Sequence, residues 1–233
     1  MADTDQSVPL CPVNEPRCEH LDELMQLRQQ VGNLKREART DALTGLFNYR
    51  HFDLVLNQEM ERVRRSGLPM VLVLCDVDHF KSFNDTHGHE AGNAMLQQVA
   101  RIIDQQLRQL DTACRYGGEE FALILPGTSM AQAAGVAERI RTTVEQATLE
   151  LASGEKVTVT LSMGLASFTS ARTIPSSELV AHADRQLYVA KSAGRNRVAT
   201  PEYREAAAKT APLVTAAEKA ALFSSGTSDQ QGE

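Results

Sequence analysis

Paired acidic residues follow an apolar run near the middle of the chain. Residues 70–75 are rich in Val and Leu, and Asp76 and Asp78 come directly after them. Carboxylates at the end of a buried strand are costly unless a cation pairs with them. Two carboxylates two residues apart can both address one hard ion, because the strand end leads into a loop that can fold around it. A helix cap or a surface turn is the alternative interpretation of this pattern.

A second acidic pair stands beside two glycines, in Gly117-Gly118-Glu119-Glu120. Glycine lets a phosphate approach the backbone closely, whereas the two acids would repel that phosphate unless a metal ion bridged them. The combination predicts a hairpin tip that holds both a metal ion and a nucleotide phosphate. A plain hairpin with solvated acids is the alternative for these four residues alone.

The elements that position these acids follow from hydrophobic periodicity. We expect a helix that begins in a capping region at Thr40-Asp41 and runs to about Arg65, and a strand over residues 70–75. Further helices are expected at 91–110, 130–148 and 176–191, and further strands at 112–116, 121–125 and from 157 past Gly164. The order β-α-β-β-α-β predicts an α/β (α+β) fold with a mixed, mostly antiparallel central sheet surrounded by helices.

Both ends of the chain differ in composition from this central part. Residues 1–18 contain three prolines among polar residues and predict a disordered lead-in. Residues 19–40 predict a helical stalk with a 3-4-3-4 seam typical of a coiled coil. The seam comprises Leu24, Leu27, Val31, Leu34 and Ala38. It spans only about two heptads, so packing on its own domain is an open alternative. Residues 200–233 predict a flexible tail rich in Ala, Ser and Thr, with a short helix near 215–222.

The overall composition limits the class of protein. A length of 233 residues fits one domain with extensions. The net charge of -6 disfavours nonspecific binding to nucleic acid or to anionic membranes. No apolar run approaches the ~20 residues of a membrane span, and the four cysteines lack zinc-site spacing. His79, His87 and His89 also lack a zinc motif. We therefore expect a cytoplasmic protein that neither binds nucleic acid nor inserts into a membrane.

Four sequence blocks extend the two acidic pairs. They are DALTGLFN at 41–48, DVDHFKSFNDTHGHEAG at 76–92, GGEEF at 117–121 and DRQLYVAKSAGRN at 184–196. Together they resemble the GGDEF family of diguanylate cyclases, in which GGEEF is one of the two common forms of the signature. The resemblance covers about residues 40–199 and implies a catalytic domain over 41–199 that follows the stalk. It also implies the nucleotidyl cyclase and polymerase palm fold.

The resemblance implies an enzyme that joins two GTP molecules into cyclic di-GMP. In such enzymes two GTP-loaded domains face each other, and each ribose 3′-hydroxyl attacks the α-phosphorus of the other GTP with loss of pyrophosphate. By motif position, magnesium or manganese would be held by Asp76, Val77, Glu119 and Glu120. The catalytic residues would be Glu119, Glu120 and Lys81. The terminal phosphates would meet Lys81, Lys191 and Arg195, and Phe80, Gly117 and Gly118 would complete the substrate site.

Two further sites are implied in the same way. Asn84 matches the residue that hydrogen-bonds the guanine edge, but its usual aspartate companion is Asn93 here. An amide has one acceptor oxygen and two donors, so guanine preference is expected to weaken. Arg108 and Asp111 match the family's RxxD inhibitory site, with Arg139 as the second arginine. An ordinary ion pair at a helix end is the alternative for Arg108 and Asp111.

The resemblance also predicts partners. The reaction requires a homodimer. Because the chain has no recognisable sensor of its own, we also expect a regulatory protein that binds the stalk and controls activity. Two other functions stay open on the sequence alone. One is a catalytically inactive receptor for cyclic di-GMP, although inactive members usually lose the acids or glycines that this chain retains. The other is a cyclase with relaxed base choice that makes some mixed cyclic dinucleotide.

Overall fold

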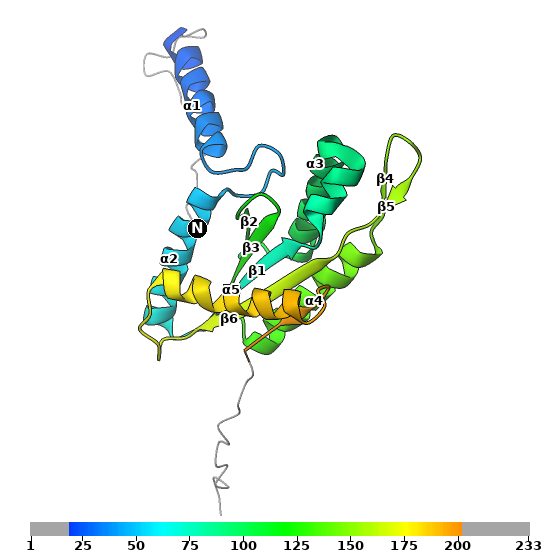
Figure 1. Ribbon diagram of the computed structural model, residues 1–233. Helices are drawn as coiled ribbons and strands as arrows, with labels where there is room; N and C mark the ends of the chain where they lie inside the picture. The colour runs from blue at the N-terminus through cyan, green and yellow to red at the C-terminus, as the bar shows by residue number, and fades with distance from the viewer. Residues whose placement is uncertain (1–18, 202–233) are drawn as a thin grey trace, which may run out of the picture. The chain divides into compact units, whose positions relative to one another are not determined.

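The computed structural model of the chain describes residues 19–201 (Figure 1). The predicted lead-in over 1–18 and nearly all of the predicted tail lie outside these residues. The helices are α1 (Glu19–Glu37), α2 (Tyr49–Ser66), α3 (Phe80–Gln106), α4 (Met130–Gln146) and α5 (Ser176–Ser192). The strands are β1 (Met70–Val77), β2 (Thr112–Arg115), β3 (Glu120–Pro126), β4 (Leu149–Glu150), β5 (Lys156–Val157), β6 (Leu161–Phe168) and β7 (Val198–Ala199).

The five-stranded central sheet has the order β2-β3-β1-β6-β7. Only β7 runs parallel to its neighbour β6, and the other pairs are antiparallel. This confirms the predicted mixed, mostly antiparallel sheet. β1 lies in the middle, and all of its residues are buried. A strand covered on both faces is expected to be a continuous apolar run, as residues 70–75 are.

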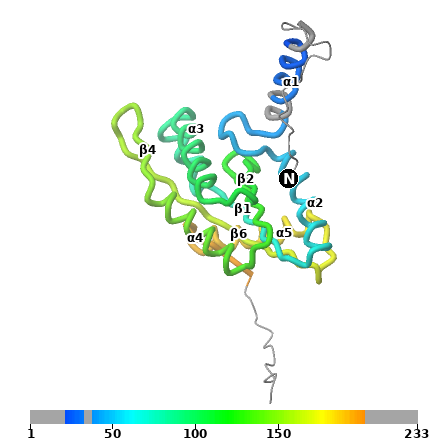
Figure 2. The backbone as a smooth tube through the Cα atoms, turned by 180° about the vertical axis from the view of Figure 1, so that it is seen from behind, coloured from blue at the N-terminus to red at the C-terminus, as the bar shows by residue number. Residues whose placement is uncertain are grey.

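Helices cover both faces of the sheet. One core contains Val71 and Val73 of β1 with residues of α3 and α4. The other contains Leu72 and Leu74 of β1 with residues of α2 and α5. Alternate residues of a strand point to opposite faces, so the two cores follow from the two-residue period of β1. Seen from opposite sides, Figures 1 and 2 show α5 on one face of the sheet and α4 on the other.

Helix α5 packs unusually close to β6. A Cβ atom on Gly164 would lie 2.1 Å from the Leu187 backbone nitrogen and 2.3 Å from the Ala183 carbonyl oxygen. Only glycine permits this backbone contact. The contact matters for the site because α5 ends in the segment that carries Lys191 and Arg195.

Three predicted element boundaries are wrong. The helix expected from Thr40 begins at Tyr49, because the Asn48 side chain caps it by accepting a hydrogen bond from the His51 N–H. Helix α3 begins at Phe80 rather than at 91, with a kink at Gly88, and it ends at Gln106. The strand expected from 157 begins at Leu161, because residues 149–157 form a separate two-strand hairpin.

The predicted stalk contains α1, and three residues of its seam are exposed. Leu24, Leu27 and Val31 are 48%, 49% and 47% exposed. Pairing of the seam with another helix, and its packing on its own domain, both stay predictions. No helix within that range is long and apolar enough to cross a membrane.

Candidate functional site

The acidic site forms where the end of β1 meets the start of β3. Asp76 is the register partner of Glu120 in the antiparallel pair of β1 and β3. The Val77 N–H donates a hydrogen bond of 3.2 Å to the Glu119 carbonyl. The structure thus brings together the two acidic motifs that lie more than forty residues apart in sequence. Asp76 is only 7% exposed, whereas Glu119 and Glu120 are half-buried at the mouth of the site.

Backbone hydrogen bonds and one arginine shape the glycine turn. The Tyr116 and Gly117 N–H groups donate to the Glu120 carbonyl at 2.8 and 3.2 Å. The Arg115 side chain donates to the Gly118 carbonyl through Nε at 3.1 Å and Nη2 at 2.7 Å. A planar guanidinium can hold one acceptor with two donors in this way. Arg115 therefore holds the carbonyl of the turn, and Gly118 itself is exposed.

Arg115 also connects the turn to the segment that follows the stalk. Its Nη1 donates to both carboxylate oxygens of Asp41, at 3.2 and 3.3 Å. Asp41 further accepts from the Thr44 N–H and hydroxyl, at 2.9 and 2.7 Å. These bonds and the positive charge of Arg115 hold the pKa of Asp41 below its usual value, despite partial burial. The Thr40-Asp41 pair predicts a helix cap, whereas in the structure the Asp41 carboxylate binds Arg115.

The three acids influence one another's protonation. Burial is the main reason that the pKa of Asp76 is raised, and Lys191 opposes this shift through a hydrogen bond and its charge. Burial followed by the negative charge of Asp76 raises the pKa of both Glu119 and Glu120. Lys191 Nζ lies 2.7 Å from Asp76 Oδ2. Carboxylates that repel one another across a strand edge are suited to bind an additional cation.

The donor set fits a divalent cation such as magnesium. Asp76, Glu119 and Glu120 offer carboxylate oxygens, the ligands that this hard ion prefers. Within residues 19–201, no three His, Cys, Asp or Glu side chains are already gathered around one point as a metal cluster. Lys191 instead supplies the counter-charge to Asp76.

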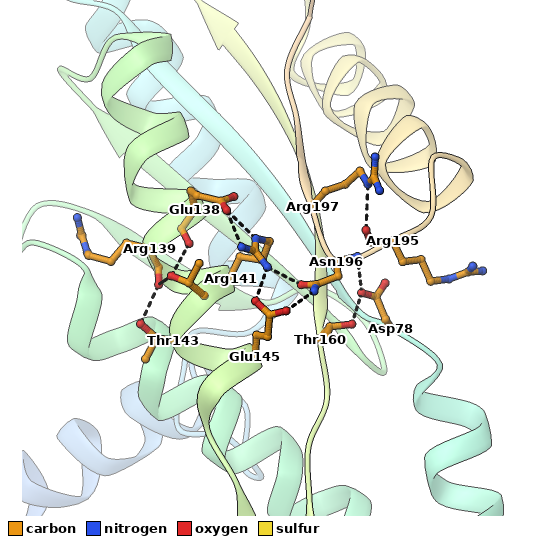
Figure 3. Close-up of polar contacts among 11 residues, drawn as sticks. Asp78, Glu138, Arg139, Arg141, Thr143, Glu145, Thr160, Arg195, Asn196 and Arg197 are labelled. Carbon is orange, nitrogen blue, oxygen red and sulfur yellow. Dashed lines mark hydrogen bonds and ion pairs between the residues drawn. The ribbon is translucent and has the colours of Figure 1, made fainter.

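Asp78, the other acid considered for this ion, has a different role. Its carboxylate accepts hydrogen bonds from the Thr160 hydroxyl at 2.7 Å, the Ser162 hydroxyl at 2.6 Å and the Asn196 N–H at 3.0 Å. Figure 3 shows Asp78 beside Thr160 and Asn196. Because both oxygens of this buried carboxylate are already satisfied, the expectation that Asp76 and Asp78 address one ion is wrong. Asp78 fixes the loop that follows α5.

The first turns of α3 carry the residues expected to bind the nucleotide. Asn84 Oδ1 is buried and has no hydrogen-bond partner among the described residues. A Cβ atom on Gly92 would lie 1.8 Å from this oxygen, so Gly92 makes room for the Asn84 side chain. A buried acceptor without a partner is costly, so a donor from a ligand or from water would stabilise it. Asn93 is exposed one residue further along.

Phe80 and Lys81 occupy the start of α3. Phe80 is 5% exposed and belongs to the core that α3 and α4 form with the sheet. Its ring stacks on that of Phe83, with the ring centroids 6.1 Å apart. Its side chain therefore supports the site rather than lining an open surface. Lys81 is exposed in the first turn of the helix, where unpaired N–H groups and a cation both favour an anion.

The residues of the predicted inhibitory site lie at the end of α3. Asp111 Oδ2 accepts from the Arg108 N–H at 2.9 Å. Within residues 19–201 the guanidinium of Arg108 has no ion-pair partner, so the alternative of a simple ion pair with Asp111 is wrong. Both residues line a pocket of about 510 Å³. Arg139 lies on α4 and donates to the Gln106 side chain and carbonyl, at 2.6 and 2.8 Å.

Comparison with known proteins agrees with these features. The family described as "Diguanylate cyclase, GGDEF domain" matches residues 38–197. Diguanylate cyclase DosC of Escherichia coli (strain K12) is 38% identical over 176 residues, which cover 75% of this chain and 37% of DosC. The chain spans less than half the length of the first curated relatives that it matches.

Solved structures are also similar to this chain, and two of them show this by their coverage and TM-score. The coiled coil and GGDEF domain of DgcB from Caulobacter crescentus, in complex with c-di-GMP, has a TM-score of 0.74 and 33% identity, and covers 78% of this chain and 95% of that one. Diguanylate cyclase SiaD of Pseudomonas aeruginosa, in complex with its activator SiaC, has a TM-score of 0.69 and 37% identity. That match covers 77% of this chain and 68% of SiaD.

Proposed function

This chain belongs to the GGDEF diguanylate cyclase family, and we propose that it condenses two GTP molecules into cyclic di-GMP and two pyrophosphates across a homodimer. The observation that carries the proposal is the group formed by Asp76, Glu119 and Glu120 beside a glycine turn, with Lys191 paired to Asp76. Acids and cations at one strand edge suit a metal-bound triphosphate.

Different residues of the site would bind the metal ion, accept the proton and bind the phosphates during phosphoryl transfer. Asp76, the Val77 carbonyl and Glu119 would hold magnesium or manganese, which neutralises phosphate charge and lowers the pKa of a bound hydroxyl. Glu120 would support a second ion or accept the proton of the attacking 3′-hydroxyl. The cationic side chains that would bind the terminal phosphates are those of Lys81, Lys191 and Arg195.

Recognition of the base would rest on Asn84 and Asn93. The unpaired Asn84 Oδ1 can accept from the guanine edge. Asn93 offers one acceptor and an NH2 donor, whereas an aspartate would accept from both the N1–H and the 2-amino group of guanine. The exposed amide of Asn93 therefore supports a second proposal, that some adenine nucleotide enters the mixed dinucleotide product.

Incubation with GTP, ATP and their mixture in the presence of magnesium tests both proposals. We expect cyclic di-GMP from GTP, and a small amount of mixed product from GTP plus ATP. The substitution Asn93→Asp should lower the share of mixed product by about tenfold. This is the effect expected when guanine gains one well-placed hydrogen bond. Mass spectrometry of the products makes the measurement. If GTP gave no cyclic di-GMP while the protein bound that dinucleotide, an inactive receptor would replace the cyclase.

We further propose that cyclic di-GMP inhibits its own synthesis at Arg108, Asp111 and Arg139. The unpaired guanidinium of Arg108 and the adjoining pocket support a phosphate ligand there. Arg108→Ala should raise the cyclic di-GMP concentration for half-inhibition by about tenfold, within the usual range of coupling between sites. Arg101→Ala, which removes an exposed arginine on α3 seven residues before Arg108, is the control. Equal sensitivity of Arg108→Ala and the wild type would contradict the proposal.

A regulatory protein bound to the stalk is the last part of the proposed function. The exposed apolar seam of α1 supports it, because exposed apolar helix faces usually meet a partner. SiaD, whose structure this chain resembles, was solved in complex with its activator SiaC. The proposed partner would shift the stalk pair between loose and productive arrangements of the catalytic domains.

A further inference from the structure

A largely covered arginine on α4 anchors the loop that follows α5. Arg141 Nε and Nη2 donate to Glu138 Oε1 at 2.9 and 2.6 Å, and Nη1 donates to Glu145 Oε2 at 2.8 Å. The same Nη1 donates to the side-chain oxygen of Asn196 at 2.7 Å. The Arg141 side chain is only 11% exposed. Its contacts are therefore not those of an ordinary surface ion pair, which contributes little.

Asn196 joins this arginine to the central sheet. Its side-chain NH2 donates to Glu145 Oε1 at 2.7 Å, while its backbone N–H donates to Asp78 Oδ2 at 3.0 Å. Its φ of 45° lies in the left-handed region, where asparagine is better tolerated than most residues. The loop is thus held on one side by α4 and on the other by the acid at the end of β1 (Figure 3).

This anchored position lies directly beside the phosphate-binding cations. Arg195 precedes Asn196, has a φ of 60° and donates its backbone N–H to the Ala190 carbonyl at 3.0 Å. Lys191 lies four residues earlier, paired with Asp76. In Figure 3 the Arg195 side chain extends away from Arg141, on the far side of Asn196. The backbone that Asn196 fixes therefore sets the direction in which Arg195 points.

We propose that Arg141 is a positioning residue for the phosphate-binding side chains, because it holds Asn196 and thereby fixes the loop from which Arg195 projects. Arg141 acts through Asn196 and does not itself touch the substrate. The inference rests on the proposed function, since it assigns the Arg195 side chain to the terminal phosphates of GTP. Glu138 and Glu145 contribute to the same positioning, because they orient the Arg141 guanidinium. Its Nη1 donates to both Glu145 and Asn196.

A double-mutant cycle with the full chain, GTP and magnesium tests this inference. Arg141→Met should raise the KM for GTP by about tenfold, the effect of one charge-assisted hydrogen bond, with kcat changed less than about twofold. Arg195→Ala should raise KM at least as much. The double variant should be no worse than Arg195→Ala alone, because both changes remove the same phosphate contact. Arg65→Met, which removes an exposed arginine paired with Glu61, should leave KM unchanged.

Hydrogen exchange gives a readout that does not depend on turnover. Without nucleotide or metal, Arg141→Met should exchange faster than the wild type in peptides covering 193–199, with β1 and β3 unchanged. If Arg141→Met does not fold, Arg141→Lys replaces it. The lysine keeps a cation between Glu138 and Glu145 but lacks the planar fork that also reaches Asn196.

The outcomes separate this inference from the proposed function. A wild-type protein that makes no cyclic di-GMP would reject the proposed function, while the exchange of residues 193–199 would still decide whether Arg141 anchors the loop. A lower melting temperature in Arg141→Met with unchanged KM and unchanged local exchange would show a purely structural role and overturn the inference. Additive effects of Arg141→Met and Arg195→Ala on KM would overturn it as well.

Discussion

Glu119→Gln is expected to lower the turnover of GTP by about 100-fold or more, the usual effect of removing a group that stabilises charge in the transition state. The Glu119 carboxylate is close enough to Asp76 for their charges to interact. The Glu119 backbone carbonyl accepts a hydrogen bond from the Val77 N–H. Glutamine has the same shape and keeps that backbone bond, but it is a poorer ligand for magnesium because it carries no charge. The measurement is kcat over a magnesium titration, in which the remaining activity should need more magnesium.

The same substitution is expected to stabilise the metal-free fold. Burial and the charge of Asp76 raise the pKa of Glu119, so the folded chain binds this proton more tightly than the unfolded chain. Stability then falls as pH rises from the unfolded pKa through the folded pKa, and at neutral pH the ionised carboxylate is a cost. Glutamine removes that cost, so the melting temperature in a chelator should be at least that of the wild type at pH 7, and the difference should shrink toward pH 4.

A matched substitution outside the site controls both measurements. Glu150→Gln changes an exposed glutamate in the small β4-β5 hairpin and should alter neither kcat nor the dependence of the melting temperature on pH. Near-wild-type turnover of Glu119→Gln with unchanged magnesium dependence would reject the assignment of Glu119 as a metal ligand. A marked loss of melting temperature in chelator would instead indicate that Glu119 is a structural residue.

The acidic part of the site could be predicted because its signals are local. The run from Met70 to Cys75 indicates a strand buried on both faces, and Asp76 comes directly at its end. The glycines at 117 and 118 indicate the hairpin that returns beside it. Antiparallel pairing then places Glu120 opposite Asp76. The two-residue period of β1 does not reveal that Asp78 is already satisfied, because its partners are more than eighty residues away.

The contacts that support the site could not be predicted, because each joins residues far apart in sequence. Arg115 meets Asp41 across 74 residues, and Arg141 meets Asn196 across 55 residues. Periodicity contains no information on such pairs. The first half of α3 was missed for another reason. Residues 81–89 are mostly polar and include Gly88, which favours a loop by propensity, whereas the tertiary contacts of Phe80 and Phe83 stabilise a helix there.

The proposed reaction would give the stalk a role in catalysis. In the proposed reaction each GTP is attacked by a hydroxyl that a second domain holds, so one set of Asp76, Glu119 and Glu120 is incomplete without another. Free domains would meet only at their bulk concentration. Pairing of α1 through its exposed Leu24, Leu27 and Val31 would raise the effective concentration of the two domains to about the millimolar range expected of short links. About two heptads pair only marginally by themselves, which leaves the pairing open to control by a bound protein.

Charged substitutions in the seam are therefore expected to lower activity sharply at low protein concentration. Leu27→Glu combined with Val31→Glu places like charges opposite each other in a parallel pair. At about 1 µM protein the initial rate should fall by about 100-fold, because the domains then meet at bulk concentration rather than at the effective concentration of the pair. The loss should shrink as protein concentration rises.

The control is Gln26→Glu with Gln29→Glu, which adds the same charge to the same helix outside the seam. Mass by light scattering and rate across protein concentration are measured together. If the seam variant keeps the mass and the rate of the wild type at about 1 µM, the catalytic domains assemble through their own surfaces and α1 is not the dimerisation element.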